Sequence, residues 1–210
     1  MPDIVVIGGG GHAKVIVSLL KKRGDYRIVG YTDRENRGAV LGIPWIGGDE
    51  VLGELIRQDP SCSAVIGVGT VGRGDTRKKL KARLEALGFH LPVLVSSDAV
   101  VSEVVYIDKA TVVFNGAVIN SGTIIGECAI LNTQSTVDHD CVIGSYVHIA
   151  PGATLSGQVK LGDEVFVGAG ATVIHGISIC PNCVIGAGAV VIEDCMTPGT
   201  YVGVPARKIK

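Results

Sequence analysis

From Val101 to Val191, an aliphatic residue occupies every sixth position of the chain. The series is Val101, Ile107, Val113, Ile119, Ile125, Leu131, Val137, Ile143, Ile149, Leu155, Leu161, Val167, Val173, Ile179, Ile185 and Val191. Two residues before each later member lies a second series that contains only Ala, Ser, Thr, Cys, Val and Ile. A repeat of short fixed period predicts a coil of stacked parallel strands, in which three hexads close one triangular turn and the aliphatic side chains fill the axis.

Turn-forming residues often follow an aliphatic member of this series directly. They are Asp108, Asn120, Gly126, Asn132, Asp138, Gly144, Gly162, Gly168 and Gly186. Because Gly, Asn and Asp tolerate positive φ better than other residues, we expect the backbone to turn through left-handed conformations at these positions.

The first part of the chain follows another pattern, in which short apolar runs alternate with helical spacing. Strands are expected over residues 4–7, 28–31, 64–68 and 92–95. One helix is expected to run as far as Gly24, and another from about residue 75 to about residue 87. The alternation predicts a small Rossmann-like α/β domain over residues 1–95, followed by a β-helix domain over residues 96–210.

Composition narrows the choice of partners. Residues 1–96 contain 14 Lys and Arg against 10 Asp and Glu, residues 97–210 contain 5 against 10, and the formal net charge is −1. This balance argues against general nucleic-acid binding and favours a small anionic ligand on the first domain. Neither a signal peptide nor a membrane span is apparent, so a cytoplasmic location is expected. Cys141, Cys183 and Cys195 fall in the small-residue series, which predicts reduced cysteines that serve packing.

A glycine-rich segment, residues 8–11, lies between the first predicted strand and the first helix. Amides at such a helix start favour a phosphate, and His12 can add a hydrogen bond. Asp33 and Gly69 follow the next two strands, so they should lie at the same edge of a parallel sheet. These residues predict a nucleotide site, with a tight structural turn as the alternative. The short domain has room for one mononucleotide-binding half, which favours a mononucleotide or a nucleotide sugar over a dinucleotide.

Basic residues cluster in the second predicted helix and just before it. They are Arg73, Arg77, Lys78, Lys79, Lys81 and Arg83. We interpret them as a solvated helix face, with a phosphate-facing role as the alternative.

Chemistry is expected at His139 and Asp140. A histidine can accept a proton near neutral pH, and an adjacent carboxylate can orient it and raise its basicity; an ordinary surface turn is the alternative. His148 follows half a coil later, so the two histidines should lie on different parts of the triangular perimeter. In a threefold assembly, His139 of one chain can face His148 of the next, which predicts a homotrimer with active sites between subunits.

Several segments together resemble the hexapeptide-repeat sugar O-acyltransferase family, which includes sialic acid O-acetyltransferases and nucleotide-sugar N-acetyltransferases. These segments are residues 8–14, Asn132, residues 139–144, His148, Gly157 and residues 203–207. The resemblance implies a left-handed coil, with His139 as the base and Asp140 as the residue that enhances its basicity. It implies acetyl-CoA contacts at His148, Gly157, Ala169 and Ala187, and substrate contacts at Gly10, Gly11, His12, Asp33, Gly69 and Asn132. Gly10 stands where the family often has Ser, and Arg34 where it often has a second acid.

Within this family, the sequence is most similar to enzymes that acetylate the 4-amino group of a UDP- or GDP-linked amino-deoxy sugar for glycan biosynthesis. Acetyl-CoA is then the cosubstrate and no metal is required. The expected mechanism is direct transfer, in which His139 accepts the amine proton and the Gly157 N–H stabilises the oxyanion.

Three alternatives remain at this point. One is O-acetylation of the sialic acid type, and another is a non-catalytic binding protein. A metalloenzyme similar to γ-class carbonic anhydrases would use His139 and His175, but Cys180 stands where its third histidine is expected.

Overall fold

A computed structural model describes residues 1–70 and 75–210, which form two compact units. Residues 1–70 and 75–92 form the first unit, and residues 93–210 form the second. Arg73, from the basic series of the second predicted helix, lies outside the described residues. No helix in the described ranges is long and apolar enough to cross a membrane.

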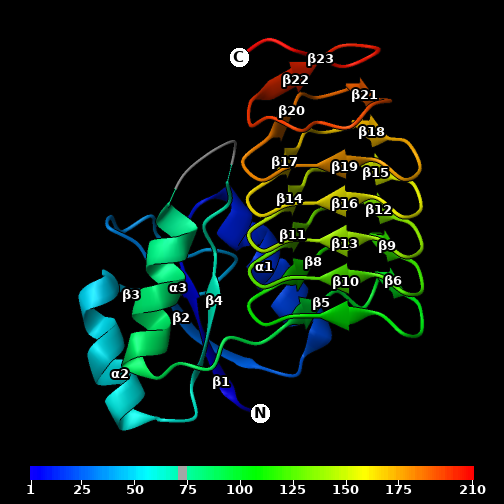
Figure 1. Ribbon diagram of the computed structural model, residues 1–210. Coiled ribbons are helices and arrows are strands. Elements are labelled where there is room, and N and C mark those ends of the chain that lie inside the picture. The colour runs from blue at the N-terminus through cyan, green and yellow to red at the C-terminus, as the bar shows by residue number, and fades with distance from the viewer. Residues whose placement is uncertain (71–74) are drawn as a thin grey trace. The chain divides into compact units, whose positions relative to one another are not determined.

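The first unit is a four-stranded parallel sheet with helices (Figure 1). Its elements are β1 (Asp3–Ile7), α1 (Gly11–Arg23), β2 (Arg27–Thr32), β3 (Trp45–Gly47), the 3-10 turn η1 (Asp49–Val51), α2 (Leu52–Gln58), β4 (Ser63–Ile66) and α3 (Thr76–Leu87). The strand order is β3-β2-β1-β4. The apolar run from Ile4 to Ile7 makes β1 a buried central strand, and α1 ends at Gly24 in the left-handed conformation. Residues 45–58 carry no strong pattern, and β3, η1 and α2 were not expected.

The solvated face predicted for the basic residues of α3 is present only in part, because Lys79 and Arg83 are exposed but two other residues are not. The side chains of Arg77 and Lys81 are buried. Arg77 donates to the carbonyl of Val68 at 2.7 Å, and Lys81 pairs with Glu85 at 2.9 Å. Buried charges are retained in proteins when they are paired and hydrogen-bonded. Arg77 and Lys81 both have such partners, so we assign them a structural role in the first unit.

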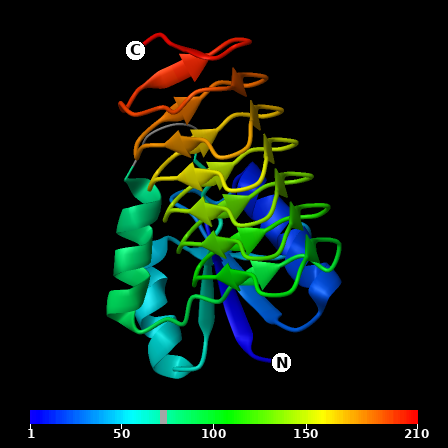
Figure 2. The same cartoon turned by 45° about the vertical axis from the view of Figure 1, so that its right-hand side comes forward.

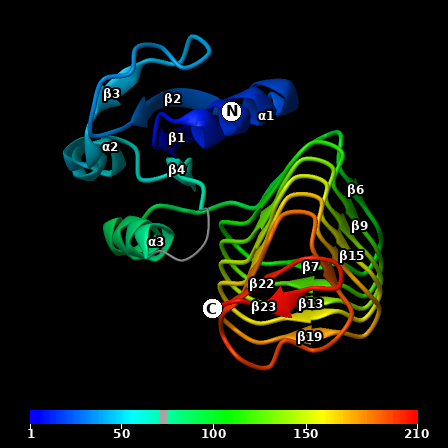
Figure 3. The ribbon, with the colours of Figure 1, turned by 90° about the horizontal axis from the view of Figure 1, so that it is seen from above.

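The second unit is a three-sided coil of short parallel strands (Figure 3). Its strands are β5 (Leu94–Val95), β6 (Val100–Val101), β7 (Tyr106–Ile107), β8 (Val112–Val113), β9 (Val118–Ile119), β10 (Ile124–Ile125), β11 (Ile130–Leu131), β12 (Thr136–Val137), β13 (Val142–Ile143), β14 (His148–Ile149), β15 (Thr154–Leu155), β16 (Lys160–Leu161), β17 (Phe166–Val167), β18 (Thr172–Val173), β19 (Ser178–Ile179), β20 (Val184–Ile185), β21 (Val190–Val191), β22 (Thr200–Val202) and β23 (Arg207–Lys208). Each coil stacks on the next (Figure 2). The strands pair in register, as Ile124 of β10 does with Val142 of β13. Only the last pair, β22 and β23, is antiparallel among the described strands.

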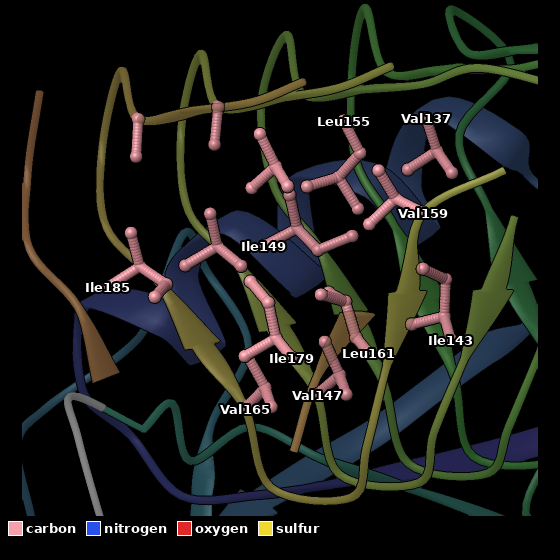
Figure 4. Packing of buried hydrophobic residues seen from close by; sticks show 14 of the residues in the cluster. Val137, Ile143, Val147, Ile149, Leu155, Val159, Leu161, Val165, Ile179 and Ile185 are labelled. Atoms are coloured by element: carbon pink, nitrogen blue, oxygen red, sulfur yellow. The ribbon is translucent and has the colours of Figure 1, made fainter. Parts of the chain in front are cut away.

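The aliphatic series fills the interior of the coil (Figure 4). Val137, Ile149, Leu155 and Ile185 are completely buried and point inward together with the small residues of the second series. Val101 is an exception at 37% exposure, because its strand lies at the edge of its sheet and has no coil before it. None of the six cysteines, all within the described residues, forms a disulfide, and burial raises the pKa of the Cys141 thiol to about 11.

The predicted positions of positive φ are wrong. Positive φ occurs three residues after the aliphatic residue, as at Gln134 (56°) and Asp140 (57°), and not directly after it. The glycines of the predicted set serve close stacking instead. A Cβ on Gly126 would lie 2.8 Å from the backbone nitrogen of Ser145, and one on Gly168 would lie 2.5 Å from that of Ala187. Neighbouring coils approach too closely there for any side chain.

Candidate functional site

His139 lies in the turn between β12 and β13, and its neighbours hold this turn in place. Asp138 accepts hydrogen bonds from the His139 N–H at 2.8 Å and from the Asn120 side-chain amide at 2.7 Å. The bond from Asn120, followed by the one from His139, keeps the pKa of Asp138 below its usual value. A charged carboxylate therefore anchors the backbone immediately before the histidine.

Asp140 contacts the imidazole of His139 directly. Its Oδ2 lies 2.9 Å from Nδ1, and φ of 57° turns the aspartate back toward the ring. The hydrogen bond to Asp140 raises the pKa of His139 more than desolvation lowers it. A proton on Nδ1, donated to Asp140, leaves the lone pair on Nε2. The pair is half exposed, so Nε2 can act as a base on a ligand.

Asp140→Asn is expected to move the acidic limb of the pH–rate profile to lower pH and to lower its plateau. The neutral amide stabilises the imidazolium less, so the pKa of His139 falls and the histidine is a weaker base. Rates measured from pH 5 to pH 9 test this. Glu103→Gln, which removes an exposed carboxylate elsewhere on the coil, is the matched control. An unchanged profile for Asp140→Asn would make Asp140 a bystander.

Gly157 lies one coil beyond His139 and beneath its ring. A Cβ at this position would lie 2.4 Å from Nε2 and 2.6 Å from Cε1 of the imidazole. The absence of a side chain therefore lets the base nitrogen project over the backbone of the next coil. Within the described part of the chain, the Gly157 N–H has no hydrogen-bond acceptor. The base and a backbone amide without a protein acceptor thus lie on adjacent coils, and these are the two groups that proton transfer and oxyanion stabilisation require.

His175 lies one further coil along the same corner, and it was not among the predicted site residues. Its ring centroid is 6.2 Å from that of His139, with the two planes tilted by 46°. The separation of two whole coils was visible in the sequence, but the short distance between the two rings became apparent only in the structure. Among the described residues, no three His, Cys, Asp or Glu side chains are arranged to hold a metal ion.

His148 and Asn132 lie at another corner of the coil. His148 belongs to β14, is 8% exposed, and packs edge-on against the Phe166 ring at a centroid distance of 5.2 Å. Its Nε2 lies 3.1 Å from the side-chain nitrogen of Asn132. Ala169 and Ala187 are exposed in the turns that follow β17 and β20 of the same sheet. One chain therefore places Gly157 beside His139 but places His148, Ala169 and Ala187 on a different corner.

The glycine segment lies at the carboxyl edge of β1 and forms the start of α1. Gly8 has φ of 109° and donates its N–H to the carbonyl of Thr32 at 2.7 Å. A Cβ on Gly9 would lie 2.3 Å from the ring of Tyr31, whereas Gly10 and Gly11 have nothing within 4 Å of that position. Gly9 is thus required by packing, while Gly10 and Gly11 leave open space beside the helix start.

Asp33, His12 and Gly69 lie close to this segment. The carboxylate of Asp33 accepts the Gly9 N–H at 2.9 Å and pairs with Arg37 at 3.0 Å. Desolvation raises the pKa of Asp33, but these bonds outweigh it and hold the pKa below its usual value. A Cβ on Gly69 would lie 3.4 Å from His12. The predicted nucleotide residues therefore meet at one edge of the sheet, and Asp33 also positions the glycine segment.

Two cavities flank the glycine segment within the first unit. One, of about 550 Å³, is lined by Gly10, Gly11, Lys14 and Arg37 among others. Its two cations and the amino end of α1 make it suited to an anionic group. The other cavity, of about 290 Å³, lies at the ends of β1 and β2 and includes Asp49, which the sequence pattern did not single out.

Comparisons with known proteins agree with this architecture. Residues 3–84 match the PglD N-terminal domain family, and residues 122–157 and 158–193 match the bacterial transferase hexapeptide family. PerB from Caulobacter crescentus, whose structure was solved in complex with CoA and GDP-perosamine, shares 36% sequence identity with this chain. The two structures superpose with a TM-score of 0.92, and the match covers 100% of this chain and 98% of PerB. The acetyltransferase domain of PglB from Neisseria gonorrhoeae FA1090 is 34% identical, with a TM-score of 0.89 over all of both chains.

One curated enzyme matches a shorter stretch. UDP-N-acetylbacillosamine N-acetyltransferase of Bacillus subtilis (strain 168) is 36% identical over 114 residues, which are 54% of this chain and 51% of that enzyme. The chain thus matches about half the length of this relative. The predicted fold, a small α/β domain followed by a left-handed β-helix of hexapeptide repeats, is confirmed.

Proposed function

Because this chain belongs to the family of hexapeptide-repeat sugar acyltransferases with a PglD-type N-terminal domain, we propose that it is a nucleotide-sugar N-acetyltransferase. Acetyl-CoA donates the acetyl group, and the acceptor is the 4-amino group of a nucleotide-linked amino-deoxy sugar for glycan biosynthesis. The observation that carries this proposal is the Nε2 of His139, which Asp140 orients and which projects over the backbone of Gly157.

The reaction follows from this geometry. The sugar amine attacks the thioester carbonyl, and Nε2 of His139 accepts the proton that the amine loses. Asp140 stabilises the resulting imidazolium through Nδ1. The Gly157 N–H donates to the oxygen that becomes negative in the tetrahedral intermediate. The C–S bond then breaks, the electron pair stays on sulfur as the coenzyme A thiolate, and no acyl-enzyme forms.

The first unit supplies the nucleotide site in this proposal. Gly10, Gly11 and His12 at the start of α1 meet the diphosphate, while Asp33 and Gly69 meet the nucleoside. On the coil, acetyl-CoA meets His148, Gly157, Ala169 and Ala187, and Asn132 lies on the substrate side. The proposed site of action is the cytoplasm, because both substrates are charged and do not cross a bilayer unaided.

A panel of UDP- and GDP-linked amino sugars, assayed with acetyl-CoA by release of free thiol, tests the activity. We expect turnover with a 4-amino sugar and no turnover when a 4-hydroxy sugar replaces it. Turnover of the hydroxyl sugar alone would instead indicate O-acetylation of the sialic acid type. Purified protein that binds no acetyl-CoA would indicate a non-catalytic binding protein.

Gly10→Val is expected to impair nucleotide-sugar binding and to leave acetyl-CoA binding intact. The helix start has an ordinary φ of −81° at Gly10, and the space around its Cβ position is empty, so the valine side chain occupies ligand space without a clash. Calorimetric titration with each substrate checks this. Asp33→Ala should weaken nucleotide binding as well, because the Gly9 N–H loses its acceptor. Unchanged nucleotide binding in both variants would count against the glycine segment as the diphosphate site.

A homotrimer with shared active sites is also part of the proposal, since one chain separates His139 from His148. Trimers of His139→Ala alone lack the base at every interface, and trimers of His148→Ala alone lack an acetyl-CoA contact at every interface. Both kinds of trimer should therefore have low activity. Every mixed trimer then has one interface that joins the two undamaged residues. Random equal mixing should therefore restore up to about one quarter of the wild-type activity. Mixed trimers with verified subunit exchange but no recovered activity would show that each site lies within one chain.

A further inference from the structure

A cavity at the carboxyl edge of β1 and β2 has the size and lining of a base pocket. Its volume is about 290 Å³, near the lower end for ligand sites, so it holds part of a nucleotide sugar and not the whole molecule. Ile7, Val68 and Leu80 provide apolar surface. Asp33, Arg34 and Asp49 provide charged groups, and Asp33 already accepts the Gly9 N–H and pairs with Arg37. An apolar slot with a few polar groups is what a flat heteroaromatic ring requires.

The carboxylate of Asp49 is held in place at the wall of this cavity. The hydroxyl of Thr32, which is completely buried at the end of β2, donates to Oδ1 at 3.0 Å. Arg83 donates to the backbone carbonyl of Asp49 at 2.8 Å and brings a guanidinium nitrogen to 3.8 Å from Oδ2. The side chain is still 29% exposed, so a ligand can reach it. A fixed carboxylate of this kind accepts hydrogen bonds without first being ordered.

The four common bases differ in what they offer to a carboxylate. Guanine presents two adjacent donors, N1–H and the 2-amino group, and a carboxylate can accept both. Uracil presents a single N–H between two carbonyl oxygens, which repel a carboxylate. Adenine and cytosine present one amino group beside a ring nitrogen that is an acceptor. A guanidinium such as that of Arg34 complements the O6 of guanine.

We propose that Asp49 recognises the base of the acceptor nucleotide sugar and that the sugar is therefore linked to guanosine diphosphate rather than uridine diphosphate. This inference rests on the proposed function, because it assigns the base within the same nucleotide site. It separates two possibilities that the family leaves open: PerB was solved with GDP-perosamine, whereas the B. subtilis relative is named for a UDP-linked sugar.

Calorimetric titration of the intact protein with GDP, UDP and IDP tests the assignment. We expect GDP to bind about fivefold or more tightly than UDP, because a good bidentate contact discriminates by at least that factor. IDP lacks the 2-amino group and should bind less tightly than GDP. Asp49→Asn should bring the three dissociation constants close together. Thr32→Val should lower the preference for GDP without a change in charge, because it releases the Asp49 carboxylate.

Glu54→Gln, which removes one exposed carboxylate from α2, is the control and should retain the full preference for GDP. Circular dichroism verifies that each variant is folded. Equal binding of GDP and UDP by the wild-type protein would overturn the base assignment while the proposed function stood. Failure of every nucleotide to bind, with acetyl-CoA still binding, would overturn the nucleotide site itself and this inference with it.

Discussion

His139→Ala is expected to lower kcat by about a hundredfold or more, since removal of a general base typically costs 10²–10⁴-fold. The imidazole is the only group at this corner that combines an oriented lone pair with a carboxylate partner among the described residues. The side chain is about half exposed and lies outside the aliphatic interior. Its loss should therefore leave the fold and the oligomeric state unchanged.

Steady-state kinetics with acetyl-CoA and the amino sugar, together with size-exclusion chromatography, measure both parts of this result. His90→Ala removes an exposed imidazole from the first unit and should leave kcat unchanged. Near-normal turnover by His139→Ala would eliminate His139 as the base.

Gly157→Ala should also lower kcat by about a hundredfold, although it adds only one methyl group. That methyl carbon would lie 2.4 Å from Nε2 of His139, closer than atoms can approach, so the ring has to rotate away. The backbone N–H of residue 157 remains, and the conformation of Gly157 is one that alanine can adopt. The loss is therefore expected from displacement of the base and not from loss of the amide donor.

The double variant His139→Ala/Gly157→Ala separates these explanations. If Gly157 acts by leaving room for the imidazole, the double variant should be no slower than His139→Ala alone, because residues that act as a unit are not additive. A further large loss in the double variant would instead assign Gly157 a role independent of the histidine. An unchanged rate in the single variant would show that the ring accommodates the methyl group without cost.

The positions of the candidate residues could be predicted to different extents. The proposed nucleotide site formed by Gly10, Gly11 and Asp33 could be recognised in the sequence. These residues follow the first two strands, and the carboxyl ends of parallel strands lie at the same edge of a sheet. Asp49 was not, since it follows a three-residue strand without a periodic pattern and gains its position from the hydroxyl of Thr32. The buried state of Arg77 was also missed, because burial of a charge depends on a partner such as the Val68 carbonyl.

The six-residue period by itself determined the coil, its axis of aliphatic side chains and its interior cysteines, because repeats that stack on one another bury the repeated hydrophobic position in a continuous core. The tertiary structure alone decided where the backbone takes positive φ, and which glycines are required by close approach. It also decided that the Cβ position of Gly157 lies against the His139 ring and that the rings of His139 and His175 approach to a centroid distance of 6.2 Å. These relations join residues one or two coils apart, so they depend on how the coils stack and not on any local pattern.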